Sequence, residues 1–202
     1  FPLGFLKGSP TVTRYRVADA LPEEFTEEFV GERLRKHAFA DIENTAEESS
    51  HGWAEILDSL SHSFPEGSYR FGPNYAFTLR LDQRRLPAKI LNRYYAIREA
   101  EFVEKTHRKP NSVKRKDMKE SLRLELLRKT LLTSDFFEAV WLTARSEVWL
   151  AGSGEKLRAL FEDHWGRTFG LTLLMLVPVT MGLELLDEEG RLRLLDLEPS
   201  LF

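Results

Sequence analysis

Seven basic side chains are concentrated in one short central stretch of the chain. They are Lys105, Arg108, Lys109, Lys114, Arg115, Lys116 and Lys119. Cationic side chains at this density bind polyanions, because each phosphate that they neutralise releases condensed counterions, and this attraction needs no sequence readout. The sequence therefore offers these seven residues as contacts for a phosphate backbone. The alternative is a solvated helix surface on which bases pair with acids four residues away, such as Glu101 with Lys105 and Lys116 with Glu120.

The charge of the whole chain conceals this concentration. Its 202 residues carry 29 basic and 32 acidic side chains, a net charge of −3. Residues 84–129 alone hold fifteen bases and six acids, a balance of +9, which leaves −12 on the remainder. A mildly acidic protein thus carries one strongly basic segment, and its acidic surroundings would confine a polyanion to that segment by repulsion.

Two adjacent aromatic residues, Phe136 and Phe137, follow the basic segment. One interpretation is that both are core residues that seat the base of the segment. The other is that one of them is exposed, where it would stack on nucleic-acid bases or wedge between them. The sequence leaves both interpretations open.

The residues that could perform catalysis are scattered. The chain has no cysteine, which excludes disulfides, thiol nucleophiles and Cys-ligated zinc. It also lacks a P-loop, a dinucleotide-binding glycine pattern and a nucleophile elbow. His51 and His62 lie near acids such as Glu55 and Asp58, but their spacing matches no usual zinc pattern. We therefore expect no enzymatic activity, no catalytic residues, no cofactor and no metal site, with a metal-dependent nuclease as the least supported hypothesis.

The spacing of apolar residues predicts the helices that must position the basic segment. A first helix is expected to begin at Leu21 and to end at Lys36. Two further helices are predicted over 86–107 and 113–131, interrupted at Pro110 and restarted at an Asn111 or Ser112 cap. Because the connection is short, these two helices should form an antiparallel hairpin.

The apolar residues of these helices should form packed stripes. One stripe contains Ile90, Tyr94 and Ile97, and the next helix contributes Met118, Leu122, Leu124, Leu126, Leu127 and Leu131. A last amphipathic helix is expected to contain Leu157, Leu160, Phe161, His164 and Trp165, with His164 as a core residue.

Alternating apolar residues predict the strands, over 11–17, 52–56, 75–82, 139–143 and 146–150. The strand 75–82 should have one solvent-exposed face, and the apolar run 171–179 should form a central strand. Residues 187–191 should form a turn, with a short strand on each side as one possibility.

These elements predict an α+β fold in which two β/α units with antiparallel-type sheets flank a long projecting helical hairpin. The expected parts are an N-terminal α+β unit over 1–83, the basic hairpin over 84–133 and a C-terminal α+β unit over 134–202, intertwined in one structural domain. The most apolar run, 169–179, is too short to span a membrane and contains Pro178. We therefore expect a cytoplasmic protein without membrane contact.

The order of these features resembles the bacterial recombination-associated RdgC family. Thr13–Val17 is similar to the family's opening strand, Gly52 and Trp53 to a Gly-Trp after its first helix, and Leu86–Ile90 to the start of its long helix. The resemblance covers residues 5–180 and continues through Lys119–Leu122, Leu131–Leu132, Trp141–Leu142, Val148–Ala151 and Val177–Val179. Two departures are that Thr133 stands where the family has a proline, and that the chain ends sooner after Val179 than family members commonly do, as in a C-terminally reduced version.

The resemblance implies a non-enzymatic, nucleoid-associated protein that forms a ring-shaped homodimer. Such proteins bind double-stranded DNA without marked sequence preference through a positively charged central hole, and they restrain the RecA recombinase by occupying DNA. By position, Phe136 would match an aromatic residue near the family's fingertip, so it joins the seven bases as a predicted DNA contact. The rival hypothesis is a protein-interaction module that does not bind DNA, with Tyr94, Tyr95 and Phe102 of the hairpin as anchors.

Overall fold

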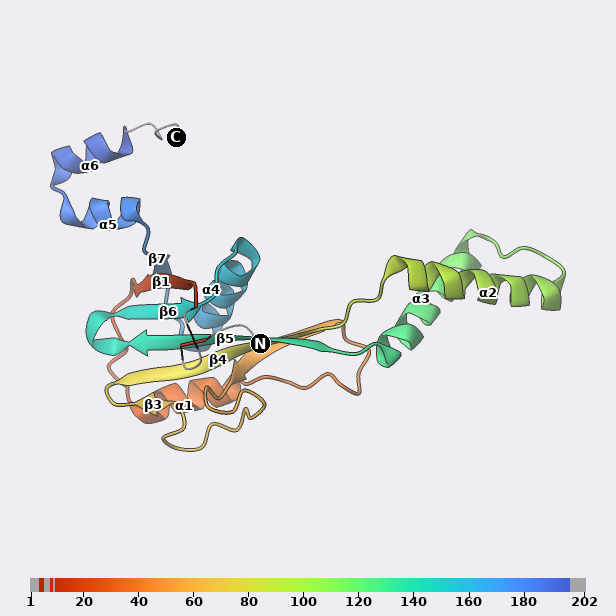
Figure 1. Cartoon of the computed structure of the whole chain (residues 1–202), viewed down its shortest axis with the longest axis horizontal. Helices are drawn as coiled ribbons and strands as arrows, with labels where there is room; N and C mark the ends of the chain where they lie inside the picture. Colours follow the sequence, from red (N-terminus) through yellow and green to blue (C-terminus); the bar gives the residue numbers. More distant parts are fainter. Residues whose placement is uncertain (1–3, 6–7, 9, 197–202) are drawn as a thin grey trace. The chain divides into compact units, whose positions relative to one another are not determined.

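The computed structural model describes residues 4–5, 8 and 10–196 (Figure 1). Among these residues the chain forms one seven-stranded sheet and six α-helices. The fold divides into two compact units, each described here by itself. The first unit contains the described residues within Phe1–Ala38, Trp53–Leu79 and Phe137–Phe202, and the second contains Phe39–Gly52 and Arg80–Phe136.

The strands form a single sheet with the order β2-β4-β5-β6-β1-β7, and β3 pairs with β4. Their bounds are β1 Val12–Val17, β2 Ser49–Ala54, β3 Arg70–Phe71, β4 Asn74–Gln83, β5 Thr133–Leu142, β6 Glu147–Ala151 and β7 Leu173–Met175. Strand β1 pairs antiparallel with both β6 and β7, and β5 pairs antiparallel with β6. The predicted mixture of α and β elements is confirmed. The prediction of two separate sheets was wrong, because β1, from the start of the chain, lies between β6 and β7, which come from the second half of the chain.

Six α-helices and one 3-10 turn connect these strands. Their bounds are α1 Glu27–Lys36, α2 Ala88–Thr106, α3 Ser112–Lys129, η1 Thr143–Arg145, α4 Glu155–Phe169, α5 Pro178–Leu185 and α6 Glu188–Leu195. Helix α1 begins later than the predicted Leu21, because the Thr26 hydroxyl caps it by accepting the Phe29 N–H at 3.2 Å. None of the helices in the described ranges combines the length and the apolar character that crossing a membrane requires.

Tryptophans and phenylalanines form the core of the first unit. Trp53, Trp141, Trp165, Phe77 and Phe161 are fully buried. The ring centroids of Trp141 and Trp165 lie 4.7 Å apart, and those of Trp53 and Phe77 lie 4.8 Å apart, both with edge-to-face geometry. Such aromatic pairs each add about 0.5–1.5 kcal/mol beyond the area that they bury.

A polar connection anchors Trp53 within this core. Its indole Nε1 donates to the Thr168 hydroxyl at 2.8 Å, and that hydroxyl donates to the His164 carbonyl at 2.7 Å. The His164 ring lies 4.7 Å from the Trp53 ring and is buried, so the prediction of a core histidine is confirmed. The hydrogen bonds satisfy the buried indole N–H, which would otherwise destabilise the core.

Strand β4 is buried on both faces along half of its length. The five residues Tyr75–Leu79 are all buried, including Ala76 and Thr78 on the face predicted to be solvent-exposed. That prediction was therefore wrong for this half of the strand. Because successive side chains of a strand point to opposite faces, five buried residues in a row show that both faces are covered along this half.

The C-terminal part differs most from its prediction. The apolar run 171–179 gives only the three-residue strand β7, which lies at the end of the sheet order and is not central. Pro178 instead occupies the first turn of α5, where its missing N–H has no cost. The predicted turn at 187–191 is the start of α6, which Asp187 caps by accepting the Gly190 N–H at 2.9 Å.

Candidate nucleic-acid interface

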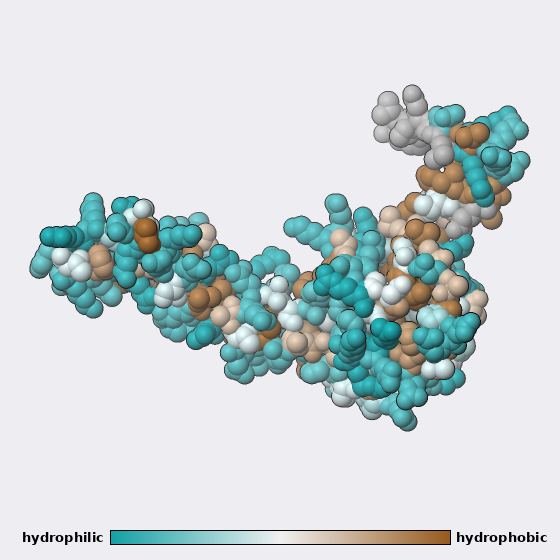
Figure 2. All heavy atoms as spheres, turned by 180° about the vertical axis from the view of Figure 1, so that it is seen from behind, coloured by the Kyte–Doolittle hydropathy of each residue, from teal (hydrophilic) through white to brown (hydrophobic). Residues whose placement is uncertain are grey.

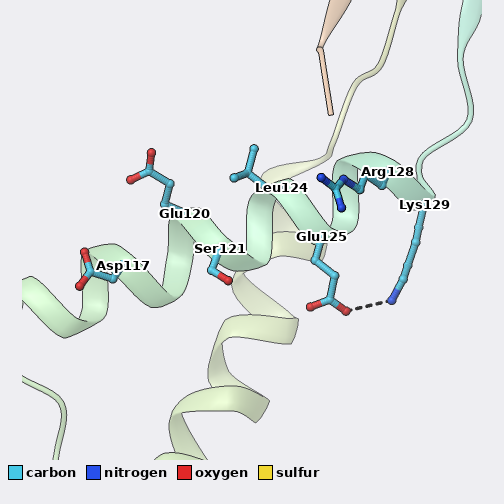
Figure 3. Close-up of a pocket in the computed structure, with 7 residues that line it drawn as sticks. All are labelled: Asp117, Glu120, Ser121, Leu124, Glu125, Arg128 and Lys129. Carbon is cyan, nitrogen blue, oxygen red and sulfur yellow. Dashed lines mark hydrogen bonds and ion pairs between the residues drawn. The ribbon is translucent and has the colours of Figure 1, made fainter. Parts of the chain in front are cut away.

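Helices α2 and α3 of the second unit contact each other through charged and aromatic side chains. Glu125 of α3 pairs with Arg98 of α2 at 2.8 Å and with Lys129 at 2.9 Å, and Figure 3 shows the second of these contacts. Hydrogen bonds from Lys129 and Arg98 lower the pKa of the Glu125 carboxyl, so it stays ionised at neutral pH. The ammonium group of Lys119 lies 4.8 Å from the centre of the Tyr95 ring. These contacts join the two helices on which the basic residues lie.

Hydrogen bonds fix the connection between α2 and α3. Helix α2 ends at His107, which adopts a left-handed conformation with φ 54° and donates its N–H to the Val103 carbonyl at 2.7 Å. Asn111 caps α3 by accepting the Lys114 N–H at 2.8 Å, which confirms the predicted break and cap. The Arg115 Nε donates to the Pro110 carbonyl at 2.9 Å. The connection is therefore an ordered scaffold for the charges around it.

The structure places the seven predicted bases around this connection. Lys105 lies in the last turn of α2, Arg108 and Lys109 lie in the connection, and the other four lie in the first turns of α3. All seven are exposed, and none of them forms an ion pair with another residue of the described ranges. The alternative pairs of Glu101 with Lys105 and of Lys116 with Glu120 do not form there either. Their positive charges are therefore available to an anion from outside.

The charges at the start of α3 oppose the helix dipole. Its first turn has no acid, and Lys114, Arg115 and Lys116 follow the cap directly. A cation near a helix N-terminus destabilises the helix by about 0.3–1 kcal/mol, because it faces the positive end of the dipole. The same end presents N–H groups that bind anions. A bound polyanion would offset this unfavourable concentration of positive charge.

Other bases of the segment are used within the second unit. Arg84 is buried and donates to the carbonyls of Thr45 and Glu47 at 2.5 and 3.4 Å, and also to that of Glu43. Arg98 and Lys129 pair with Glu125, as described above. The count of fifteen bases in 84–129 therefore includes groups that are not free to bind a ligand, and the sequence alone could not separate them.

Phe136 lies in β5, outside the connection between α2 and α3. It is half-buried, and the Arg80 guanidinium lies 5.8 Å from its ring and 4.0 Å from the ring of Phe39. Arg80 also forms a two-point ion pair with the buried Asp82, at 3.0 and 2.8 Å. The neighbouring Phe137 packs against the core of the first unit. Phe137 is therefore partly buried at the border of the core, whereas Phe136 borders a buried ion pair, so the interpretation of both as core residues is supported only for the contact that Phe137 makes.

The acids near the scattered histidines have structural partners. The Glu55 carboxylate accepts hydrogen bonds from the hydroxyls of Ser61 and Ser63 at 2.6 and 3.1 Å and from the Phe64 N–H at 3.1 Å. Within the part of the chain that the structure describes, no group of three or more His, Asp or Glu side chains could hold a metal ion.

Sequence reasoning missed an exposed apolar face on α2. Ile90, Tyr94 and Ile97 are 43, 48 and 48% exposed, and α2 has no buried residue at all, so their prediction as a packed stripe was wrong. On α3 the predicted stripe holds for Met118, Leu122, Leu126 and Leu127, whereas Leu124 is exposed. Leu131 lies beyond the end of α3 and is also exposed. Brown patches interrupt the largely hydrophilic surface of these helices in Figure 2. The sequence shows that the stripe exists but not whether a partner covers it.

Comparison with protein families places most of the chain in a known family. The family model described as "Putative exonuclease, RdgC" matches residues 11–161. The match runs from β1 into α4 and contains all seven exposed bases and Phe136. No curated protein matches the chain.

Proposed function

Because the chain belongs to the RdgC family, we propose that it is a recombination-related protein that binds double-stranded DNA without sequence preference and without catalysis. The observation that carries this proposal is the set of seven exposed bases around the α2–α3 connection that have no ion pair among the described residues. Lys105, Arg108, Lys109, Lys114, Arg115, Lys116 and Lys119 would contact phosphates. Phe136 would take part only if DNA reaches β5.

In this proposal, residues 84–133 act as the hairpin that contacts the duplex. Backbone contacts of lysine and arginine give affinity but carry no sequence information. The remaining residues have a net negative charge, so their repulsion would direct DNA to this segment. By occupying DNA the protein would limit the access of the RecA recombinase. In this proposal the protein would act in the bacterial nucleoid.

The salt dependence of binding tests this proposal. If the seven bases each neutralise one phosphate, the logarithm of the association constant should fall with the logarithm of salt concentration with a slope of about −6. We would measure fluorescence anisotropy of labelled duplexes of about 30 base pairs with unrelated sequences, between about 50 and 200 mM salt. Equal affinities for these duplexes and a steep slope support the proposal. Absence of binding at the lowest salt concentration, or strong preference for one sequence, contradicts it.

The name of the matching family model requires a nuclease control. The same duplexes, labelled at one end, would be incubated with the protein and Mg²⁺ or Mn²⁺. The proposal expects the DNA to remain intact at protein concentrations that saturate binding. Progressive shortening would instead show that the protein is an exonuclease and would overturn the non-enzymatic part of the proposal.

The exposed face of α2 favours a protein partner, and we propose that this partner is a second copy of the chain. Ile90, Tyr94 and Ile97 are spaced i, i+4 and i+7, so they share one face of the helix. Ile97 lies at the middle of α2, with Arg93 four residues before it at the border of this face and Glu101 four residues after it on the same face. A two-fold axis at Ile97 that pairs two α2 helices in antiparallel orientation would therefore bring Arg93 of each copy near Glu101 of the other.

Charge reversal tests this homodimer. Light scattering coupled to gel filtration should show a dimer for the wild type and a monomer for Tyr94→Asp, since an aspartate would have to be buried in the interface. Arg93→Glu and Glu101→Arg should each weaken the dimer, and the double variant should restore it. A monomeric wild type contradicts the proposal. If the chain bound another protein with an affinity that does not depend on salt, and did not bind DNA, the protein-interaction module would be favoured instead.

A further inference from the structure

A groove runs along α3 beyond the α2–α3 connection. It has a volume of about 510 Å³ and is lined by Lys116, Lys119, Glu120, Arg123 and Leu124 of α3, Leu91 of α2 and Glu48. The three bases are spaced i, i+3 and i+7, so they form a row on one face of the helix. Lys116 and Lys119 belong to the proposed DNA contacts, whereas Arg123 extends the row to a residue that neither the sequence nor the family match singled out.

The guanidinium at the end of this row holds a carboxylate. The Arg123 Nη2 lies 2.5 Å from the Glu48 Oε1, and both side chains are about half exposed. A carboxylate that accepts from arginine occupies the position that a phosphate oxygen would take, because both anions present oxygen acceptors to the planar donor group. The contact therefore fits an anion site whose present occupant is a side chain of the same unit.

Glu48 belongs to an acidic segment with a fixed backbone. Residues 41–48 contain Asp41, Glu43, Glu47 and Glu48 and no base. The buried Arg84 holds the carbonyls of this segment through its side chain, and its backbone N–H donates to the Glu48 carbonyl at 2.8 Å. Because these bonds do not involve the Glu48 carboxylate, the segment does not depend on the pair with Arg123 for its position.

We propose that this groove is a phosphodiester subsite in which the Glu48 carboxylate competes with DNA for Arg123. The inference rests on the proposed DNA binding and adds its regulation. When a duplex engages Lys116 and Lys119, the next phosphate reaches Arg123 only by displacing the carboxylate, which then returns to solvent. The acidic segment thereby weakens DNA binding and favours release.

Replacement of Glu48 by glutamine tests the proposal. Exposed ion pairs contribute about 0.2–1 kcal/mol, so Glu48→Gln should tighten duplex binding roughly 1.4- to 5-fold at about 0.1 M salt. Without the competing carboxylate, Arg123 contacts a phosphate in a larger share of the bound complexes, so the salt slope should become steeper, by at most about 0.9. The matched control is Glu47→Gln, which removes the same charge from the same segment, where Glu47 has no side-chain ion pair among the described residues. Its effect should be smaller, and its slope should equal that of the wild type.

A double-mutant cycle separates competition from general repulsion. Arg123→Gln should weaken binding more in the Glu48→Gln background than in the wild type, because only there is the guanidinium free from the start. The inference would be overturned if Glu48→Gln and Glu47→Gln bound the duplex equally well, or if Glu48→Gln bound it more weakly than the wild type. Either result would leave the proposed function standing. A wild type that binds no DNA at the lowest salt concentration would overturn both.

Discussion

A triple variant with Lys109→Glu, Lys114→Glu and Lys116→Glu should bind duplex DNA at least about 100-fold more weakly than the wild type at about 0.1 M salt. The three side chains are exposed and flank the α2–α3 connection. Each replacement removes one phosphate contact and adds a like charge beside the backbone. The salt slope should become shallower by about 2.7, since each lost contact contributes about 0.9. The loss should be the same for every duplex sequence, because phosphate contacts do not read bases.

The control for this variant carries the same change in net charge elsewhere. Arg145, Lys156 and Arg191 are exposed bases of the first unit without ion pairs among the described residues. Their triple replacement by glutamate should change the affinity far less, because only the long-range field changes. Comparable losses in the two variants would show that net charge and not the α2–α3 connection determines binding. Far-UV circular dichroism would verify that α2 and α3 still form, since the replacements also remove cations from the N-terminal end of α3.

Truncation of Trp53 should lower the free energy of unfolding by about 3–5 kcal/mol. Its side chain is fully buried, its ring contacts Phe77, and its N–H donates to Thr168. Trp53→Ala therefore leaves a cavity among rigid rings and removes the hydrogen-bond partner of the Thr168 hydroxyl. Urea unfolding followed by fluorescence of the remaining tryptophans would measure the loss.

Trp149 provides the matched control in the same sheet. It is half-buried on β6, its indole N–H donates to Glu147 at 2.9 Å, and Arg14 lies over its ring. Trp149→Ala should be clearly less destabilising than Trp53→Ala, because the Trp149 side chain is only partly buried, so its truncation leaves no enclosed cavity. If both variants lost the same free energy of unfolding, the size of the removed side chain and not its packing in the core would determine the loss. Thr168→Val would remove both hydrogen bonds of this hydroxyl, the one from the Trp53 indole and the one to the His164 carbonyl, and we expect each to contribute about 1 kcal/mol.

Local signals in the sequence located most of the elements. The alternation at Val12–Val17, the break at Pro110 and the cap at Asn111 all depend on neighbouring residues, and the structure confirms them. The single sheet could not be predicted, because the pairing of β1 with β6 and β7 joins residues more than a hundred positions apart. The run around Leu173 was misassigned for a related reason, since its apolar character does not distinguish an inner strand from an edge strand followed by a helix.

In the candidate site, too, the features that depend on neighbouring residues could be predicted, and those that depend on tertiary contacts could not. The concentration of bases at 105–119 is visible in the composition, and the structure places these bases around one short connection. Burial of Arg84 and the pairs of Arg98 and Arg123 with acids depend on tertiary contacts, so the count of fifteen bases could not identify them. Periodicity places Ile90, Tyr94 and Ile97 on one face but gives no information on whether that face is covered.

The location of the aromatic side chains has an optical consequence. All four tryptophans lie in the first unit, at Trp53, Trp141, Trp149 and Trp165. Apart from phenylalanines, the near-ultraviolet chromophores of the second unit are Tyr94 and Tyr95. Tryptophan fluorescence therefore reports on the first unit alone and does not detect local rearrangements around the basic residues. A ligand that shifts this emission must alter the environment of the indoles, and a tryptophan introduced at Tyr95 would supply the missing signal from α2.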